Sequence, residues 1–337
     1  MPFEGKQLSL MRASIALAAA LACMSAAQAE VVRWRMATEY PETAMPGESL
    51  TLFAREIEMR TAGAVVIVPS FDGSAGIKSA NIPDAVRDGQ LDAGDTFGAA
   101  LSGIDPVFEL CMLPFVATTI DDARHLADLA RPFYARAFEF QDQHLLYLTP
   151  WPSTGLWSRT PVPTVEALRG LDIRTYDKTS QRVMQSAGVK AESLSISDVF
   201  PRLENGTITA ALSSSDGGAG RKLWTLLPNF TAINYAVPLS FATVSTKAYE
   251  ALTPELRLAV DEAAKMTERH QWGRLQTRLV ENKRRMQEHQ VAVVDIPPPE
   301  IRDVLRAAAA PAVAEWKLKA GPVAAAMLDR ALAIESR

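Results

Sequence analysis

The chain has 337 residues, with 35 lysines and arginines against 39 aspartates and glutamates and a formal net charge of −4 at pH 7. About half of its residues (48%) are hydrophobic, which is the balance of an ordinary globular protein with well-filled cores. The slightly acidic charge argues against nucleic acid or an anionic membrane as the main partner, because both attract basic surfaces. The length predicts about two domains.

The N-terminus has the three parts of a secretory signal peptide. Arg12 provides the basic start, residues 13–22 form a short apolar core, and Ala27-Gln28-Ala29 is a small-x-small cleavage site. The apolar core is too short for a stable membrane-spanning helix. We therefore expect residues 1–29 to be removed on export, leaving a periplasmic mature chain of residues 30–337. A buried N-terminal helix is the alternative.

The two cysteines fit an exported protein without a disulfide. Cys23 falls inside the signal region and leaves open the alternative of a lipoprotein anchor. Cleavage after residue 29 leaves Cys111 alone, so an oxidising compartment cannot form an internal bridge. Because Cys111 lies in the apolar run of residues 110–113, we interpret it as a core residue rather than a nucleophile.

In the first half of the mature chain, the apolar periodicity predicts strands that alternate with helices. We expect strands at residues 31–37, 64–69, 91–97 and 145–149 and helices at residues 46–61, 81–88 and 119–140. Gly63 and Gly89 end two of these helices. Alternation of this kind favours a parallel α/β sheet.

The same rhythm restarts after Pro150. We expect strands at residues 170–174 and 207–212 and helices at residues 179–187 and 197–205. The glycine-rich segment 216–220 matches neither a P-loop nor a dinucleotide-binding turn, and we interpret it as a loop. The second half therefore repeats the architecture of the first half without repeating its sequence.

Long helices are predicted for the C-terminal third. Thr253 is a good N-cap before a proline, and the periodic segment that follows reaches His289, long enough to brace two lobes. After an elbow at residues 297–299, alanine-rich helices are expected at residues 300–320 and 322–335. We expect Pro311 to break or kink the first of these two.

A search for catalytic chemistry finds no local signature. The four histidines lack ligand partners at metal spacing, and the chain contains neither a C-x-x-C pair nor a nucleophile elbow. The sequence therefore predicts no catalytic residues, no metal and no cofactor.

Several stretches resemble the solute-binding proteins of TRAP transporters, of the C4-dicarboxylate-binding (DctP-like) type. The resemblance follows the chain in order through residues 82–93, the tripeptide Leu113-Pro114-Phe115, residues 168–174, residues 198–206 and residues 251–255. Each match is weak alone, but together they cover nearly the whole mature chain and follow a signal peptide.

This resemblance implies an α/β fold with two lobes, crossing strands and a long bracing helix. The implied first lobe is residues 30–150 with about 238–280, and the second lobe is residues 151–237 with about 281–337. It also implies a cleft that captures a small organic carboxylate, hand-over to the membrane subunits of a TRAP transporter, and no catalysis. We expect a monomer.

Arg174 is the first candidate for the ligand site. It ends a predicted strand, where α/β folds place ligands, and its guanidinium offers two parallel donors to a carboxylate. In the resembling family, the arginine at this position of the motif grips the carboxylate. By the same comparison, Trp157 stands where many members carry a second arginine, and Leu212 and Ser213 stand where they carry charged or amide partners.

These replacements favour a monocarboxylate with an apolar or aromatic body over a dicarboxylate, because a second carboxylate would lose its partner. The further candidates lie near predicted strand ends or beside Arg174: Phe97, Ser213, Ser214, Tyr176, Glu39, Tyr40, Trp151, Trp224 and Asn234. Three alternatives remain open: a dicarboxylate-binding protein, a binding protein for a sensory partner, and a periplasmic carboxylic-acid lyase or dehydratase.

Overall fold

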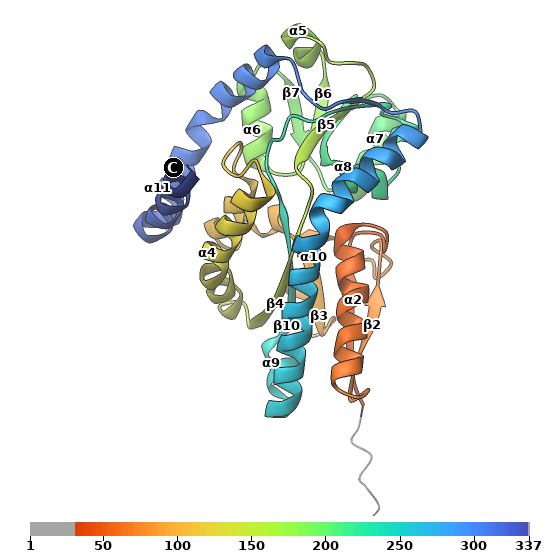
Figure 1. The fold of residues 1–337 in the computed structure, drawn as a ribbon, viewed down its shortest axis with the longest axis vertical. Helices are drawn as coiled ribbons and strands as arrows, with labels where there is room; N and C mark the ends of the chain where they lie inside the picture. Colours follow the sequence, from red (N-terminus) through yellow and green to blue (C-terminus); the bar gives the residue numbers. More distant parts are fainter. Residues whose placement is uncertain (1–30, 336–337) are drawn as a thin grey trace, which may run out of the picture.

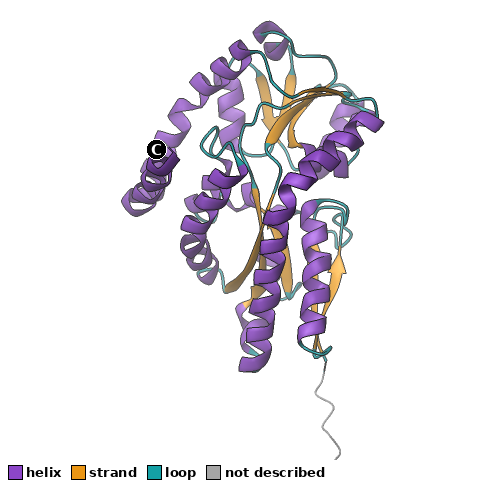
Figure 2. Ribbon diagram, viewed as in Figure 1, coloured by secondary structure: helices purple, strands orange, loops and turns teal. Residues whose placement is uncertain are grey.

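The protein is seen in a computed structural model that describes residues 31–335; the expected signal peptide, residues 1–29, lies outside them. Two separate β-sheets, one of five strands and one of six, are flanked by helices (Figures 1 and 2). Each sheet is the centre of one lobe, so the two-lobed α/β architecture is confirmed. The lobe boundaries expected near residues 150, 238 and 280 stay predictions.

The first lobe contains the sheet with strand order β2-β1-β3-β10-β4. Its strands are β1 (Val32–Thr38), β2 (Val65–Ser70), β3 (Ala93–Phe97), β4 (Gln143–Pro150) and β10 (Leu239–Ser245). β1 pairs in parallel with β2 and β3, whereas β10 runs antiparallel to β3 and β4. The expectation of a purely parallel sheet is therefore wrong, because β10 enters the first lobe from the second half of the chain.

Helices α2 (Met45–Arg60), α3 (Ile82–Arg87), α4 (Ile120–Glu139) and α9 (Thr246–Glu250) belong to this lobe. Thr119 starts α4 with a capping box, in which its hydroxyl accepts from Asp122 N while the Asp122 carboxylate accepts from Thr119 N.

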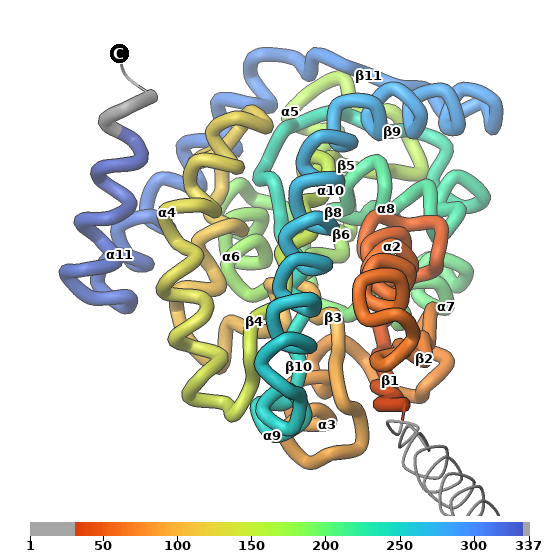
Figure 3. Tube along the Cα trace, turned by 60° about the horizontal axis from the view of Figure 1, so that its bottom comes forward, coloured from red at the N-terminus to blue at the C-terminus, as the bar shows by residue number. Residues whose placement is uncertain are grey.

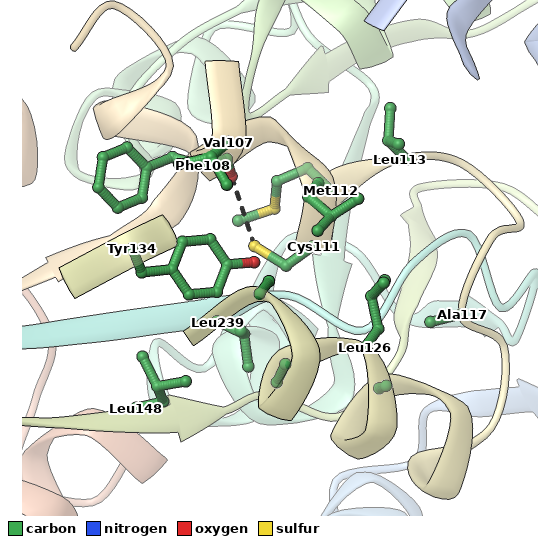
Figure 4. Packing of buried hydrophobic residues seen from close by; sticks show 14 of the residues in the cluster. Val107, Phe108, Cys111, Met112, Leu113, Ala117, Leu126, Tyr134, Leu148 and Leu239 are labelled. Carbon is green, nitrogen blue, oxygen red and sulfur yellow. Dashed lines mark hydrogen bonds between the residues drawn. The ribbon is translucent and has the colours of Figure 1, made fainter. Parts of the chain in front are cut away.

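The core between α4 and the sheet is aromatic and aliphatic (Figure 4). Phe108 and Tyr134 stack with ring centroids 5.7 Å apart, and Phe241 of β10 packs edge-on against both. Cys111 is buried here, and its thiol donates to the Phe108 carbonyl at 3.5 Å. Burial raises the pKa of Cys111 to about 12, so the thiol stays protonated and its interpretation as a core residue holds.

The second lobe contains the sheet with strand order β11-β9-β5-β8-β6-β7. Its strands are β5 (Thr154–Ser158), β6 (Asp172–Thr175), β7 (Lys190–Ser193), β8 (Ala210–Ser214), β9 (Asn229–Thr231) and β11 (Ala292–Val294). Its short helices are α5 (Val165–Arg169), α6 (Lys178–Ser186), α7 (Val199–Glu204) and α8 (Ser215–Gly220).

Helix α8 corrects the expectation of a loop at residues 216–220. The Ser214 hydroxyl accepts from Gly217 N at 3.0 Å and caps the helix. A Cβ on Gly218 would lie 2.2 Å from the Trp157 indole, so glycine at this position lets α8 lie directly on β5. The glycines therefore serve close packing rather than a flexible loop.

Helix α10 (Pro254–Glu288) runs along both lobes (Figures 1 and 3). It contacts α2 and β4 of the first lobe and α8 and β11 of the second. Thr253 caps it through its hydroxyl, which accepts from Leu256 N. The predicted brace is therefore present, within one residue of both expected ends.

Helix α11 (Pro299–Glu335) also reaches both lobes. Ile301 belongs to the core of the second lobe, whereas Trp316 and Leu328 belong to that of the first. The backbone stays helical through Pro311 and leaves helical geometry only at Gly321, where φ is 83°. A break at Pro311 is therefore wrong, because packing on either side of it holds the helix, whereas a kink there stays a prediction. Within residues 31–335, no helix has the length and apolarity needed to cross a membrane.

Candidate ligand-binding site

The two lobes meet around a small cavity at the ends of their strands. Its lining comes from both sheets: Tyr40, Phe97, Trp151, Thr154, Arg174, Tyr176, Ile196, Leu212, Ser213, Ser214, Gly217 and Pro238. The cavity volume is about 30 Å³, which is enough for about two water molecules. An organic acid is larger, so its entry requires the lobes to move apart.

Arg174 is the cation of this cavity. It lies on β6 and is only 4% exposed, with Nε donating to the Leu194 carbonyl at 2.8 Å and Nη1 to the Leu212 carbonyl at 3.0 Å. Burial lowers the pKa of Arg174, while the nearby Tyr40 and Glu39 oppose that shift. Among residues 31–335, no carboxylate forms an ion pair with it, so its charge is fixed in place by neutral groups and lacks a counter-ion.

A buried guanidinium without a counter-ion is costly, and a bound anion would offset that cost. The hydrogen bonds of Nε and Nη1 to these two carbonyls fix the orientation of the guanidinium. Nη2 makes no hydrogen bond with the described residues, so its N–H groups are free to donate to a carboxylate oxygen.

Four aromatic rings form one wall of the cavity. Trp151 packs edge-on against Tyr40 with ring centroids 4.6 Å apart and against Phe97 at 5.9 Å. Phe97 in turn meets Tyr176 at 5.8 Å. Trp151 Nε1 donates to Ser240 Oγ at 3.0 Å, which fixes the indole. This wall suits an apolar or ring-shaped ligand body.

Hydroxyl groups complete the polar side. Among residues 31–335, the buried Tyr176 hydroxyl has no hydrogen-bond partner of good geometry, although the Thr154 side chain is near it. A ligand oxygen would satisfy it. Ser213 and Ser214 lie at the end of β8, with the Ser214 hydroxyl accepting from Gly217 N.

The structure brings Arg174, Phe97, Ser213, Ser214, Tyr176, Tyr40 and Trp151 together around one cavity. Glu39 lies beside it, in an adjoining cavity of about 170 Å³ that shares Arg174 and Phe97. Seven of the eleven predicted residues thus line the same space, and an eighth borders it.

Three predicted residues lie elsewhere. Trp157 is fully buried in the second lobe, where it packs on Phe230 and donates to the Ser214 carbonyl at 3.2 Å. Trp224 stacks on His289 with centroids 4.2 Å apart. Asn234 borders a different cavity, beside α10.

The sequence analysis missed Thr154, Ile196 and Pro238. Pro238 precedes β10, which was not predicted because its polar residues Ser240, Thr243 and Ser245 are not spaced at the regular period of two that marks a half-buried strand. Thr154 opens β5, directly after the segment that joins the lobes, and a β-branched residue after Pro152 was the only available signal.

The chemical groups of the site are few. Within residues 31–335, no group of three or more histidine, cysteine, aspartate or glutamate side chains is arranged to hold a metal ion. The cavity has one cation, hydroxyls and aromatic rings, which can orient and enclose an anion.

Two α/β lobes that enclose a small ligand cavity, joined by crossing segments and a bracing helix, define a bacterial solute-binding protein. Residues 36–319 match the model of bacterial extracellular solute-binding protein family 7 (DctP). The chain belongs to this family, and the predicted resemblance to TRAP-transporter solute-binding proteins is confirmed. The family is one of transport proteins rather than enzymes.

Solved structures agree with this assignment. DctP7 of Bordetella pertussis, an extracytoplasmic solute receptor that binds pyroglutamic acid, is 26% identical with a TM-score of 0.84, covering 89% of this chain and 99% of its own. DctP6 of the same organism, also a receptor for pyroglutamic acid, is 25% identical with the same TM-score and coverage. A curated solute-binding protein of Chromohalobacter salexigens is 23% identical over 77% of this chain and 78% of its own.

Proposed function

We propose that this protein captures a small organic monocarboxylate in the periplasm and delivers it to the membrane subunits of a TRAP transporter. The observation that carries the proposal is Arg174, a buried cation that lines the cavity between the lobes and makes no direct ion pair among residues 31–335. The ligand carboxylate would accept from Nη2, and the lobes would close over it.

The rest of the lining favours a compact body with one negative charge. The aromatic rings of Tyr40, Phe97 and Trp151 offer an apolar face, whereas the cavity has no second cation for a second carboxylate. Pyroglutamic acid, which both Bordetella receptors bind, is a compact ring with one carboxylate and is our first candidate ligand. A short dicarboxylate is the runner-up, and Ser213 and Ser214 would have to hold its second group.

We further infer that ligand binding is not followed by chemical change, because the lining offers no nucleophile paired with a base. A lyase or dehydratase would release an altered acid, whereas a binding protein releases the acid unchanged. The periplasmic location rests on removal of residues 1–29 as a signal peptide.

A melting experiment tests the carboxylate site. Residues 30–337 are purified, unfolded and refolded to remove carried-over ligand, and melted with L-pyroglutamate, other monocarboxylates and dicarboxylates. A ligand at about 100 times its Kd stabilises the folded state by about 2.7 kcal/mol. We expect a compact monocarboxylate to raise the midpoint in the wild type and to have no effect on Arg174→Ala. If no acid shifts the wild type, the carboxylate proposal fails.

A further inference from the structure

Glu39 is a buried carboxylate that bridges the two lobes beside the ligand cavity. It follows β1 of the first lobe and is only 3% exposed. Its Oε2 accepts from Ser79 N of the same lobe at 2.9 Å, and its Oε1 accepts from Ser195 Oγ of the second lobe at 2.5 Å. It therefore lies where the two lobes come together.

This carboxylate keeps its negative charge. Burial alone would raise the pKa of Glu39, but hydrogen bonds from Ser195 and Ser79 outweigh burial and hold the pKa below its ordinary value. Within residues 31–335, no lysine or arginine forms an ion pair with it. The neighbouring cation Arg221 donates to the Glu39 carbonyl and pairs with Asp72 at 2.9 Å.

Glu39 and Arg174 line the same cavity, and Lys78, the other cation of its lining, is paired with the Asp198 carboxylate at 2.8 Å. The cavity of about 170 Å³ that Glu39 lines also includes Arg174, and the charge of Glu39 supports the protonated state of that arginine. A ligand carboxylate bound to Arg174 is attracted by the guanidinium, whereas a second carboxylate that extends through this cavity approaches Glu39.

We propose that Glu39 is a specificity determinant that excludes ligands whose second negative charge would enter this adjoining cavity. Like charges placed together in a site with little water cost several kcal/mol, and natural binding sites use such repulsion to reject the wrong partner. This role presupposes the carboxylate site proposed above. It makes Glu39 a group that repels wrong ligands, in addition to joining the lobes.

A matched pair of ligands isolates the effect of charge. Glutaramate and glutarate have the same size, but an amide replaces one carboxylate in glutaramate. Isothermal titration of both, to the wild type and to Glu39→Gln, gives the ratio of their affinities. We expect the wild type to bind glutaramate at least about tenfold more tightly. Glu39→Gln should lower that preference about tenfold through a gain for glutarate.

A second variant separates charge from lobe closure. Ser195→Ala removes the hydrogen bond between the lobes, and titration of all variants at about pH 8 keeps the Glu39 carboxylate ionised even without that bond. The variant should therefore weaken both ligands alike and preserve the ratio. Both ligands are measured on one preparation, so a reduced folded fraction affects them equally. The role of Glu39 is overturned if glutarate gains nothing on Glu39→Gln, or if Ser195→Ala changes the ratio as much. Retained L-pyroglutamate binding by Arg174→Ala would instead count against the carboxylate site itself.

Discussion

Asp216 joins the two lobes through a buried network of hydrogen bonds, and its removal should be strongly destabilising. It lies in α8 of the second lobe and is completely buried. Its Oδ1 accepts from Arg278 Nε at 2.5 Å and from Asn282 Nδ2 at 3.1 Å on α10, and its Oδ2 accepts from Met45 N at 2.8 Å at the start of α2. One carboxylate thus ties three helices together.

In Asp216→Ala, the largest loss is the charge partner of Arg278, which is itself only 4% exposed. Glu48 at 2.8 Å and Glu281 at 3.7 Å remain as partners, but both are partly exposed and pair with Nη1 rather than Nε. Breaking a buried ion pair from one side costs about 3–5 kcal/mol. For a chain of this size, we expect the melting temperature to fall by about 5–10 °C.

The assay is thermal unfolding followed by circular dichroism, with Arg278→Met added as a second substitution. Removing the buried Arg278 charge, which Asp216 no longer balances, should restore part of the lost stability, so Asp216→Ala/Arg278→Met should melt above Asp216→Ala. A fall of less than about 2 °C in Asp216→Ala, or a double variant that is no more stable than the single one, would refute this account of the network.

Two further substitutions test the packing of α8 in the second lobe and the protonation of a buried carboxyl group in the first lobe. Gly218→Ala places a Cβ 2.2 Å from the Trp157 indole and should lower the free energy of unfolding by about 1–3 kcal/mol, measured by urea unfolding. The control Gly170→Ala, with its nearest atoms 3.5 Å away, should change the stability little. Equal losses in the two variants would contradict the packing of α8 on β5. Burial raises the pKa of Asp95 to about 7, so the folded state holds this proton more tightly than the unfolded state, and stability falls as the pH rises from about 4 to about 7. The free energy of unfolding of Asp95→Asn should therefore rise by about 2–4 kcal/mol relative to that of the wild type between pH 4 and pH 8. If the melting temperatures of the two proteins change in parallel with pH, the raised pKa of Asp95 is contradicted.

Helix ends and strand ends were predictable where local chemistry marks them. Helix α10 was placed within one residue because Thr253 and the following proline form a cap that needs no tertiary contact. Arg174 was expected at a strand end and lies there, because the ends of strands in α/β folds share one side of the sheet.

The face of the sheet on which a given side chain lies was not predictable from the sequence in the same way. Trp157 was placed in the site by its position in a motif, but a side chain on β5 changes faces with every residue. The structure turns Trp157 toward Phe230 and α8, and Thr154 faces the cavity instead. Which face a residue occupies depends on pairing with β8 and β9, and those contacts join segments more than 50 residues apart.

The proposed function depends most directly on one side chain, and calorimetry of L-pyroglutamate binding to three proteins measures its contribution. The wild type, Arg174→Ala and Arg159→Ala are titrated under the same conditions; Arg159 donates to the Leu203 carbonyl, outside the cavity. We expect Arg174→Ala to weaken binding by about 2–5 kcal/mol, or at least thirtyfold, and Arg159→Ala to bind as the wild type does. Equal binding by all three proteins would contradict the assignment of Arg174 as the carboxylate anchor.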